Sequence, residues 1–129
     1  MKTIFGFFLI INCLVCTVGA QDVRVEQAAV LVKQSKTFIL DVRTAEEFDA
    51  GHFRGAVNVP VAALKEERAQ LPADKNQPIL TYCTVGVRSA RARRILKAMG
   101  YQQVYNLAGG INAWINAGQI VTEPARIKR

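Results

Sequence analysis

One cysteine of this chain stands where its chemistry could be used, at the start of the stretch CTVGVR, residues 83–88. Gly86 lies in the middle of the stretch and Arg88 ends it. A cysteine reacts as the thiolate, and its pKa falls when a helix N-terminus or a cation is close. Backbone amides that converge on Cys83 would form a nest for an anion, and a glycine permits the tight turn that this needs. The stretch therefore predicts a nucleophilic thiol in an anion-binding loop.

The other side chains of the loop, residues 84–88, have smaller expected roles. Thr84 could add a hydroxyl donor to the nest. Val85 and Val87 would make the floor or the rim of the nest apolar, unless they pack the loop onto the domain. Such a loop would hold a charged sulfur species, a phosphate or an arsenate, and the loop by itself leaves that choice open.

The first twenty residues predict a cleaved secretory signal peptide. Lys2 precedes an apolar run that extends to about Val15, and small residues then lead to Ala20. A short basic region, a short apolar core and small residues before a polar step are typical of such a signal. The apolar run is shorter than the roughly 20 residues that a membrane-spanning helix needs. We therefore expect cleavage after Ala20, a periplasmic or otherwise exported protein, and no stable membrane insertion after cleavage.

Cleavage would leave Cys83 as the last cysteine of the chain. The other two, Cys13 and Cys16, lie inside the predicted signal. A lone cysteine in an exported protein indicates a reactive thiol or an intermolecular bond. The alternative is a buried cysteine that packs as a small apolar side chain. The remaining chain has the length of one domain and can bury a single core.

The chain is basic, with 17 Lys and Arg residues against 10 Asp and Glu residues and a formal net charge of +7. The basic residues cluster in two segments: Arg88, Arg91, Arg93, Arg94 and Lys97, then Arg126, Lys128 and Arg129. Such a balance favours anionic ligands. Arg91 and Arg94 could steer anions towards the loop or belong to a solvated helix face. Because export argues against nucleic acid, a small anion is the expected ligand.

Short apolar runs alternate with helical patterns along the chain. The expected strands are 37–42, 55–60, 77–83 and 103–107, and the expected helices are 26–34, 45–50, 61–71, 88–100 and 110–118. This alternation predicts an α/β fold with a mainly parallel sheet and helices on both faces. Ligands of such sheets bind beyond the carboxyl ends of strands, which is where Cys83 stands. Residues 119–129 lack periodicity and predict a loose tail, so the domain is expected at 21–118.

Local signals mark the ends of two of these helices. Thr44, followed three residues later by Glu47, forms a capping box that begins a short helix. Gly51 is expected to end that helix, and Gly100 the basic one, as left-handed C-terminal caps do.

Two longer segments resemble the two halves of a single-domain rhodanese, a family of sulfurtransferases. FILDVRTAEEFDAGHFRGAVNVP, residues 38–60, resembles the N-terminal half, and YCTVGVRSARARRILKAMGYQQVYNLAGGINAW, residues 82–114, resembles the C-terminal half. The short, exported format is similar to the phage shock protein E type within that family. The resemblance implies a sheet of about five strands flanked by helices, with a persulfide carried on Cys83.

The resemblance also implies a reaction in two covalent steps. Cys83 would take the outer sulfur of thiosulfate or a similar donor, and a thiol, cyanide or a protein acceptor would then remove it. Residues 84–88 would cradle the persulfide, Arg88 would buttress the loop or attract the anion, and Ser89 is a further supporting candidate. The resemblance implies neither a cofactor nor a metal.

Two alternatives compete with a sulfurtransferase. A cysteine phosphatase or arsenate reductase would place five residues between cysteine and arginine, whereas four separate Cys83 from Arg88. The tighter loop predicts a nest for a single sulfur rather than for a phosphate. The second alternative is a non-catalytic persulfide or anion carrier or a binding module. Thr84 and Val85 depart from many rhodaneses, which have a basic residue at one of these positions.

Structural rather than catalytic roles are expected for the remaining polar and aromatic candidates. Asp41 and Arg43 follow a predicted strand and could orient the active loop through a salt bridge, since a buried charge needs a partner. His52, the only histidine, is expected to satisfy backbone groups rather than act as a base. Trp114 and Tyr101 are expected to pack in the core.

Overall fold

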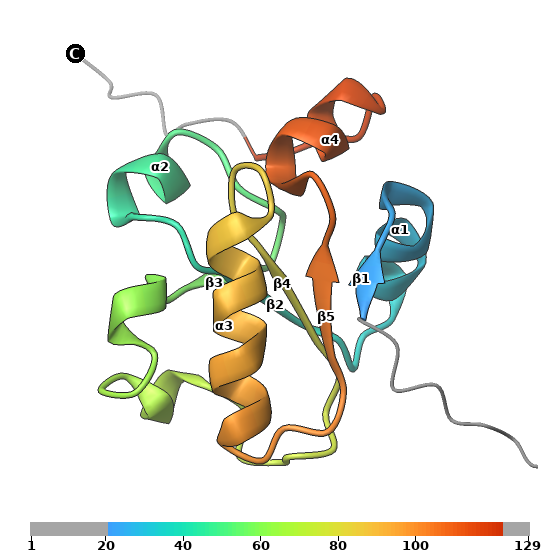
Figure 1. Ribbon diagram of the computed structural model, residues 1–129. Coiled ribbons are helices and arrows are strands. Elements are labelled where there is room, and N and C mark those ends of the chain that lie inside the picture. The colour runs from blue at the N-terminus through green and yellow to red at the C-terminus, as the bar shows by residue number, and fades with distance from the viewer. Residues whose placement is uncertain (1–20, 123–129) are drawn as a thin grey trace, which may run out of the picture.

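A computed structural model describes residues 21–122, so the predicted signal peptide and residues 123–129 lie outside the described residues. Five strands form one sheet in the order β1-β5-β4-β2-β3, and every neighbouring pair is parallel (Figure 1). The strands are β1 (Asp22–Val23), β2 (Phe38–Asp41), β3 (Val57–Asn58), β4 (Ile79–Tyr82) and β5 (Val104–Leu107). The prediction of a five-stranded, parallel α/β fold is confirmed.

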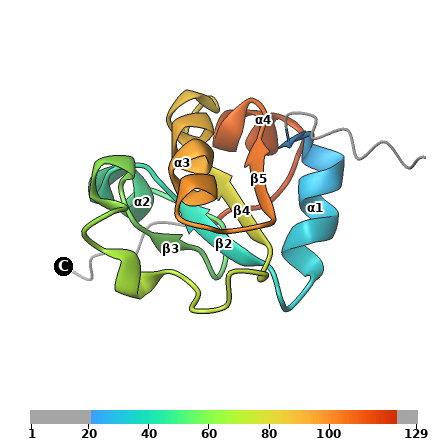
Figure 2. The same ribbon diagram turned by 60° about the horizontal axis from the view of Figure 1, so that its bottom comes forward.

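Four helices cover the two faces of this sheet (Figure 1 and Figure 2). They are α1 (Val25–Lys33), α2 (Ala45–Asp49), α3 (Val87–Ala98) and α4 (Gly110–Asn116). Alternate residues of the strands point to opposite faces, so two cores form. Leu40 packs with Leu96 of α3 on one face, and Leu80 packs with Trp114 of α4 on the other, where α1 also lies. Among the described residues, no helix is both long and apolar enough to cross a bilayer.

The prediction of a helix at residues 61–71 is wrong. The segment forms two separate 3-10 turns, Val61–Ala63 and Arg68–Gln70. Leu64 and Leu71 suggested a helix by their spacing, and both are indeed buried beside α3. A short helix is marginal in itself, so the burial of these two leucines decides the backbone path rather than helical periodicity.

The predicted helix ends are present. The Thr44 side chain accepts from the Glu47 amide at 3.2 Å, and the Glu47 carboxylate accepts from the Thr44 amide at 3.3 Å. Gly100 follows α3 with a φ of 99°, and the next amide, of Tyr101, donates to the Leu96 carbonyl at 3.2 Å. Gly51 follows α2 with a positive φ of 147°. A helix that ends on glycine in this way can satisfy its last carbonyls at little steric cost.

Two short segments are structured although the spacing of apolar residues did not predict it. Strand β1 is only two residues long and exists by pairing with β5 at the edge of the sheet. Residues 119–122, the beginning of the tail expected to be loose, are tied to the domain. The Thr122 amide donates to the His52 carbonyl at 2.8 Å, and the Trp114 indole donates to the Ile120 carbonyl at 3.1 Å.

A buried ion pair fixes the end of β2. The Arg43 guanidinium donates to the Asp41 carboxylate at 2.7 Å and to the Gly51 carbonyl at 2.7 Å. Asp41 is fully buried and Arg43 is nearly so. The Asn58 amide group donates to the carbonyls of both residues. This pair therefore joins β2, β3 and the end of α2, which places the start of α2 beside the cysteine loop.

Candidate active site

Three hydrogen-bond donors converge on the sulfur of Cys83, directly after the carboxyl end of β4. The Gly86 amide lies 3.1 Å from Sγ, the Ser89 hydroxyl 3.3 Å and the Ser89 amide 3.5 Å. Cys83 is 1% exposed, so these donors take the place of water around the sulfur. The described residues contain this one free cysteine. Of the amides of residues 84–88 that were expected to converge, the Gly86 amide donates to Sγ, and Ser89, the supporting candidate next to the loop, supplies the other two donors.

Burial and hydrogen bonding have opposite effects on the acidity of this thiol. Burial raises the pKa of Cys83, because a thiolate is poorly solvated inside a protein. The hydrogen bonds from Ser89 and Gly86, with a smaller contribution from the nearby Val85 amide, outweigh burial and hold the pKa below its ordinary value. A cysteine that only filled apolar space would have a raised pKa. Cys83 is therefore both buried and prepared to ionise.

Gly86 gives the loop its turn and starts the basic helix. Its φ is +100°, a value that favours glycine, and it is the N-cap of α3. A Cβ at this position would meet the Leu107 carbonyl and the Gly109 amide, each at 3.3 Å. The first turn of α3 consequently points its free amides at Cys83, one residue earlier than the helix start that the sequence predicts.

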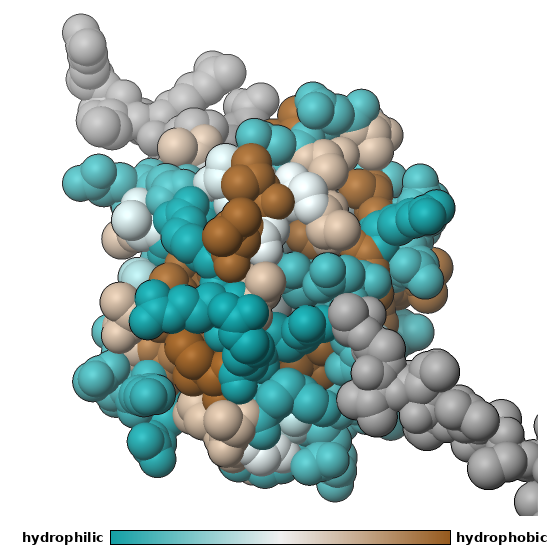
Figure 3. Space-filling view, viewed as in Figure 1, coloured by the Kyte–Doolittle hydropathy of each residue, from teal (hydrophilic) through white to brown (hydrophobic). Residues whose placement is uncertain are grey.

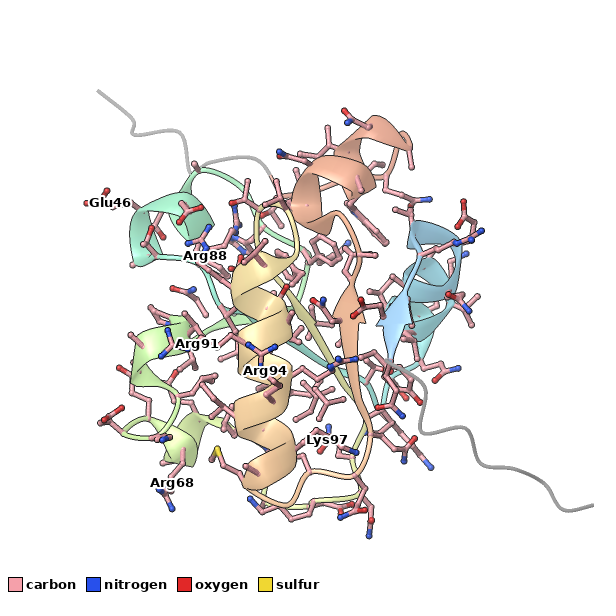
Figure 4. All side chains as sticks on the ribbon, in the orientation of Figure 1. Glu46, Arg68, Arg88, Arg91, Arg94 and Lys97 are labelled. Carbon is pink, nitrogen blue, oxygen red and sulfur yellow. The ribbon has the colours of Figure 1, made fainter. Side chains whose placement is uncertain are left out.

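The hydrogen bonds of the Arg88 side chain go to α2 and to Thr84. Its guanidinium makes two bonds to the Glu47 carboxylate, at 2.7 and 2.8 Å, and a third to the Thr84 hydroxyl at 3.0 Å. Figure 4 shows Arg88 reaching from the top of α3 towards α2. Arg88 holds the pKa of the Glu47 carboxyl far below its usual range, and Glu47 in turn raises the pKa of Arg88, with a smaller contribution from the nearby Cys83. Arg88 was expected either to support the loop or to attract the anion, and these contacts support the loop.

The role expected for Thr84 needs correction. Its hydroxyl donates to Glu47 at 2.8 Å. A hydroxyl has a single proton, so this one is not available to an anion in the nest. Val85 and Val87 are 56% and 74% exposed. They therefore form an apolar rim outside the nest rather than its floor, and Figure 3 shows apolar surface over the loop at the top of α3.

Sequence reasoning missed Glu47 as a site residue. The capping-box spacing identified its local role, but its bonds to Arg88 and Thr84 join residues that lie 41 and 37 positions away in the chain. No local pattern reports such a contact. Only the packing of α2 against the loop brings this carboxylate to its partners.

A second anchor that the sequence did not reveal comes from the start of α4. The amides of Ile111 and Asn112 donate to the carbonyls of Cys83 and Thr84, at 2.9 and 3.2 Å. This approach requires Gly110, because a Cβ there would lie 2.5 Å from the Cys83 and Thr84 carbonyl oxygens. The sequence analysis placed Gly110 at the start of a helix and did not indicate a contact with the cysteine.

His52, Trp114 and Tyr101 make the contacts that were expected of them, whereas Asp41 and Arg43 form their expected salt bridge without a hydrogen bond to the cysteine loop. His52 Nδ1 lies 2.8 Å from the Phe48 carbonyl, and its ring stacks on Phe48 with 3.6 Å between centroids. Trp114 and Tyr101 are buried in the two cores. Asp41 and Arg43 bond to each other and to the backbone, without a hydrogen bond to Cys83.

Comparison with known proteins identifies the family. The model of the Rhodanese family, described as a rhodanese-like domain, matches residues 24–117. This chain belongs to the rhodanese family. The crystal structure of a rhodanese-related protein from Thermoplasma volcanium superimposes with a TM-score of 0.70 at 26% identity, over 79% of this chain and 97% of that one.

The related sequences show how diverse the family is. Thiosulfate sulfurtransferase PspE of Escherichia coli is 42% identical over 72 residues, which cover 56% of this chain and 68% of PspE. The uncharacterized protein YqhL of Bacillus subtilis is 40% identical over 79 residues, 61% of each chain. A tRNA uridine(34) hydroxylase of Buchnera aphidicola is 32% identical over 94 residues, but this rhodanese spans only 30% of its length.

Replacement of Ser89 should change the acidity of the thiol. We expect Ser89→Ala to raise the pKa of Cys83, because the variant loses a donor that favours the thiolate. Ultraviolet absorbance of the thiolate, followed against pH, measures this pKa. Ser35→Ala, an exposed change in the turn after α1, is the matched control and should leave the titration in place. An unchanged or lowered pKa in Ser89→Ala would contradict the assigned hydrogen bond.

Replacement of Glu47 should loosen the loop. Glu47→Ala removes both carboxylate oxygens that bind the Arg88 guanidinium and also the acceptor of the Thr84 hydroxyl. We therefore expect a loss of about 1–2 kcal/mol in unfolding free energy for this partly exposed network. Amide hydrogen exchange in residues 84–88 should become faster. Glu46→Ala, next to it and exposed, should change stability by less than about 0.5 kcal/mol. Equal effects of the two changes would show that the loop does not depend on Glu47.

Proposed function

We propose that this rhodanese is a sulfurtransferase that moves sulfane sulfur from thiosulfate, or a similar donor, to a thiophilic acceptor through a persulfide on Cys83. The observation that carries the proposal is the convergence of the Gly86 amide and both Ser89 donors on a single sulfur of lowered pKa. The relative named thiosulfate sulfurtransferase, at 42% identity, supports it.

The first step transfers one sulfur atom to the enzyme. The Cys83 thiolate attacks the outer sulfur of thiosulfate, a new S–S bond forms, and the bond between that sulfur and the sulfite group breaks. Sulfite leaves with the electron pair of the broken bond, so the negative charge of the thiolate passes to the outer sulfur of the persulfide. This is covalent catalysis, which replaces one difficult transfer by two easier ones.

The second step returns the enzyme to its starting state. Cyanide or a thiolate attacks the outer sulfur, and Cys83 leaves as the thiolate. The donors of Gly86 and Ser89 stabilise that leaving group without having to reorganise. The positive end of the α3 macrodipole lies at the same place and favours a negative charge in both forms of the enzyme.

Entry of the donor requires the loop to move, because Cys83 is 1% exposed. The exposed side chains of Val85 and Val87 leave the outer surface of the loop free of packing. The anchors lie at other points, on Thr84 and Arg88 and on the carbonyls of Cys83 and Thr84. We infer that the segment around Val85 moves outward to admit the donor, while the anchored residues keep the hydrogen-bond donors in position around the sulfur.

A phosphatase or arsenate reductase has less support. Such a site would use its arginine to bind the oxyanion, and here the Arg88 guanidinium is engaged by two oxygens of Glu47. The donors that do face the thiol surround one sulfur atom. A carrier that binds persulfide without turnover shares the first step and is separated from an enzyme by the acceptor reaction.

Mass spectrometry tests the covalent step directly. Incubation with thiosulfate should add about 32 mass units, one sulfur atom, to the peptide that contains Cys83. Cyanide should then remove this mass and yield thiocyanate. Cys83→Ser should do neither and should keep the wild-type fold by circular dichroism. Thiocyanate formation by that variant, or turnover of an aryl phosphate by the wild type without any added sulfur, would refute the proposal.

We also propose that the protein acts in the periplasm or otherwise outside the cytoplasm, after cleavage behind Ala20. The support is the basic, apolar and small-residue pattern of residues 1–20. Sequencing of the exported protein should give Gln21 as the first residue. A chain that keeps Met1 and stays in the cytoplasm would contradict this.

A further inference from the structure

A groove with a cationic border lies between the second 3-10 turn and the C-terminal half of α3. It has a volume of about 370 Å³. Its lining combines three cationic residues with three apolar ones and no carboxylate: Lys65, Arg68, Arg94, Ile95, Ala98 and Met99. Figure 4 shows Arg94 on the exposed side of α3 and Arg68 beside the foot of the helix.

The three cations of this groove have no acidic partner in residues 21–122. The ion pairs there join Arg43 with Asp41, Arg88 with Glu47 and Arg93 with Asp22. The Arg68 side chain is held by a hydrogen bond from its Nε to the Lys65 carbonyl at 3.1 Å. Glu66 and Glu67 lie between Lys65 and Arg68 in the sequence but do not line the groove, so the charged side chains that the groove presents to a ligand are all cationic and favour negative charge.

Helix α3 runs from the cysteine loop to the groove. Val87, Arg91, Arg94 and Ala98 follow the spacing of one helix face, and all four are exposed. At about 1.5 Å per residue, the distance from Val87 to Ala98 along the helix is about 16 Å. Val87 directly follows Gly86, whose amide binds the Cys83 sulfur. One exposed helix face thus leads from an apolar rim at the thiol to a basic groove with an apolar lining, which we call the α3 face.

We propose that the α3 face docks an acidic segment of a protein that receives sulfur from Cys83. The inference rests on the proposed sulfurtransferase function. An acidic residue would meet Lys65 and Arg68, and an apolar side chain beside it would enter the groove against Ile95 and Met99. In an extended chain, at about 3.3 Å per residue, some five residues would connect this anchor to a cysteine at the loop.

The chemistry of the surface favours a protein over other anions. A small donor such as thiosulfate needs only the nest, and gains nothing from an apolar groove about 16 Å away. Single-stranded nucleic acid is usually held by aromatic side chains on which bases stack, whereas the apolar lining here is aliphatic.

The transfer itself needs no additional reagent. The partner's cysteine thiolate attacks the outer sulfur of the Cys83 persulfide and forms a new S–S bond. The bond from that sulfur to Sγ of Cys83 breaks, and Cys83 leaves as the thiolate with the electron pair. The partner then carries the persulfide, and the number of sulfur atoms, electrons and charges is unchanged.

Synthetic peptides and charge reversal test this docking. Each probe is a peptide of about twelve residues with one cysteine and one Leu-Glu-Glu anchor five residues away from it. The anchor precedes the cysteine in one peptide and follows it in the other. Each peptide is matched by one that has Leu-Lys-Lys in place of Leu-Glu-Glu. The double change Lys65→Glu and Arg68→Glu reverses the groove charge. The double change Lys33→Glu and Lys36→Glu, at the end of α1 and beyond it, alters the net charge equally on the other face of the sheet and is the control.

We expect the wild type and the control to transfer sulfur to the acidic peptides at least about tenfold more efficiently in kcat/KM than to the basic ones, through KM. The groove variant should lose or invert this preference and keep its turnover of thiosulfate with cyanide. Equal use of both peptides, or equal loss in the control variant, would overturn the docking proposal. Failure of the wild type to use cyanide would refute the sulfurtransferase function instead. Binding to vesicles of anionic phospholipid that only the groove variant loses would assign the α3 face to membranes and also overturn the proposal.

Discussion

The site depends on a balance at the sulfur of Cys83, where burial disfavours the thiolate and hydrogen bonds favour it. The residue is almost completely removed from water, so an ionised sulfur loses its hydration. The Gly86 and Ser89 donors replace that hydration with dipoles that are already in position. Because they outweigh burial, the same arrangement can hide a thiol and keep it reactive. Every one of these donors belongs to the loop or the first turn of α3, so the balance lasts only as long as the loop keeps its shape.

That shape is imposed from outside the loop. Glu47 of α2 holds Arg88 and Thr84 from one side, and the first amides of α4 hold the carbonyls of Cys83 and Thr84 from another. The Asn106 side chain of β5 adds a bond to the Gly86 carbonyl at 3.3 Å. The parallel sheet makes this possible, because the carboxyl ends of all its strands meet at one edge, where the following helices begin. The acidity of one thiol is therefore a property of most of the fold.

Helix α3 connects this chemistry with a surface that could choose its partner. Its first turn supplies donors to the sulfur, while its exposed face carries Val87 at the thiol and Arg94 at the basic groove. A helix is rigid over this length, so the distance between reaction and recognition is set by the backbone and not by flexible loops. In the docking that we propose, this helix would let the protein treat small acceptors and protein acceptors differently without any change at the cysteine.

The sequence by itself determined the parallel α/β fold, the place of Cys83 at a strand end, the turn at Gly86 and the cap at Gly100. These features follow from apolar alternation and turn chemistry, which act over a few neighbouring residues. Only the tertiary structure decided that residues 61–71 form two turns, that the Thr84 hydroxyl donates to Glu47, and that Glu47 and Gly110 hold the loop. Those outcomes depend on which segments pack side by side, and the energy of such contacts is absent from any local pattern of residues.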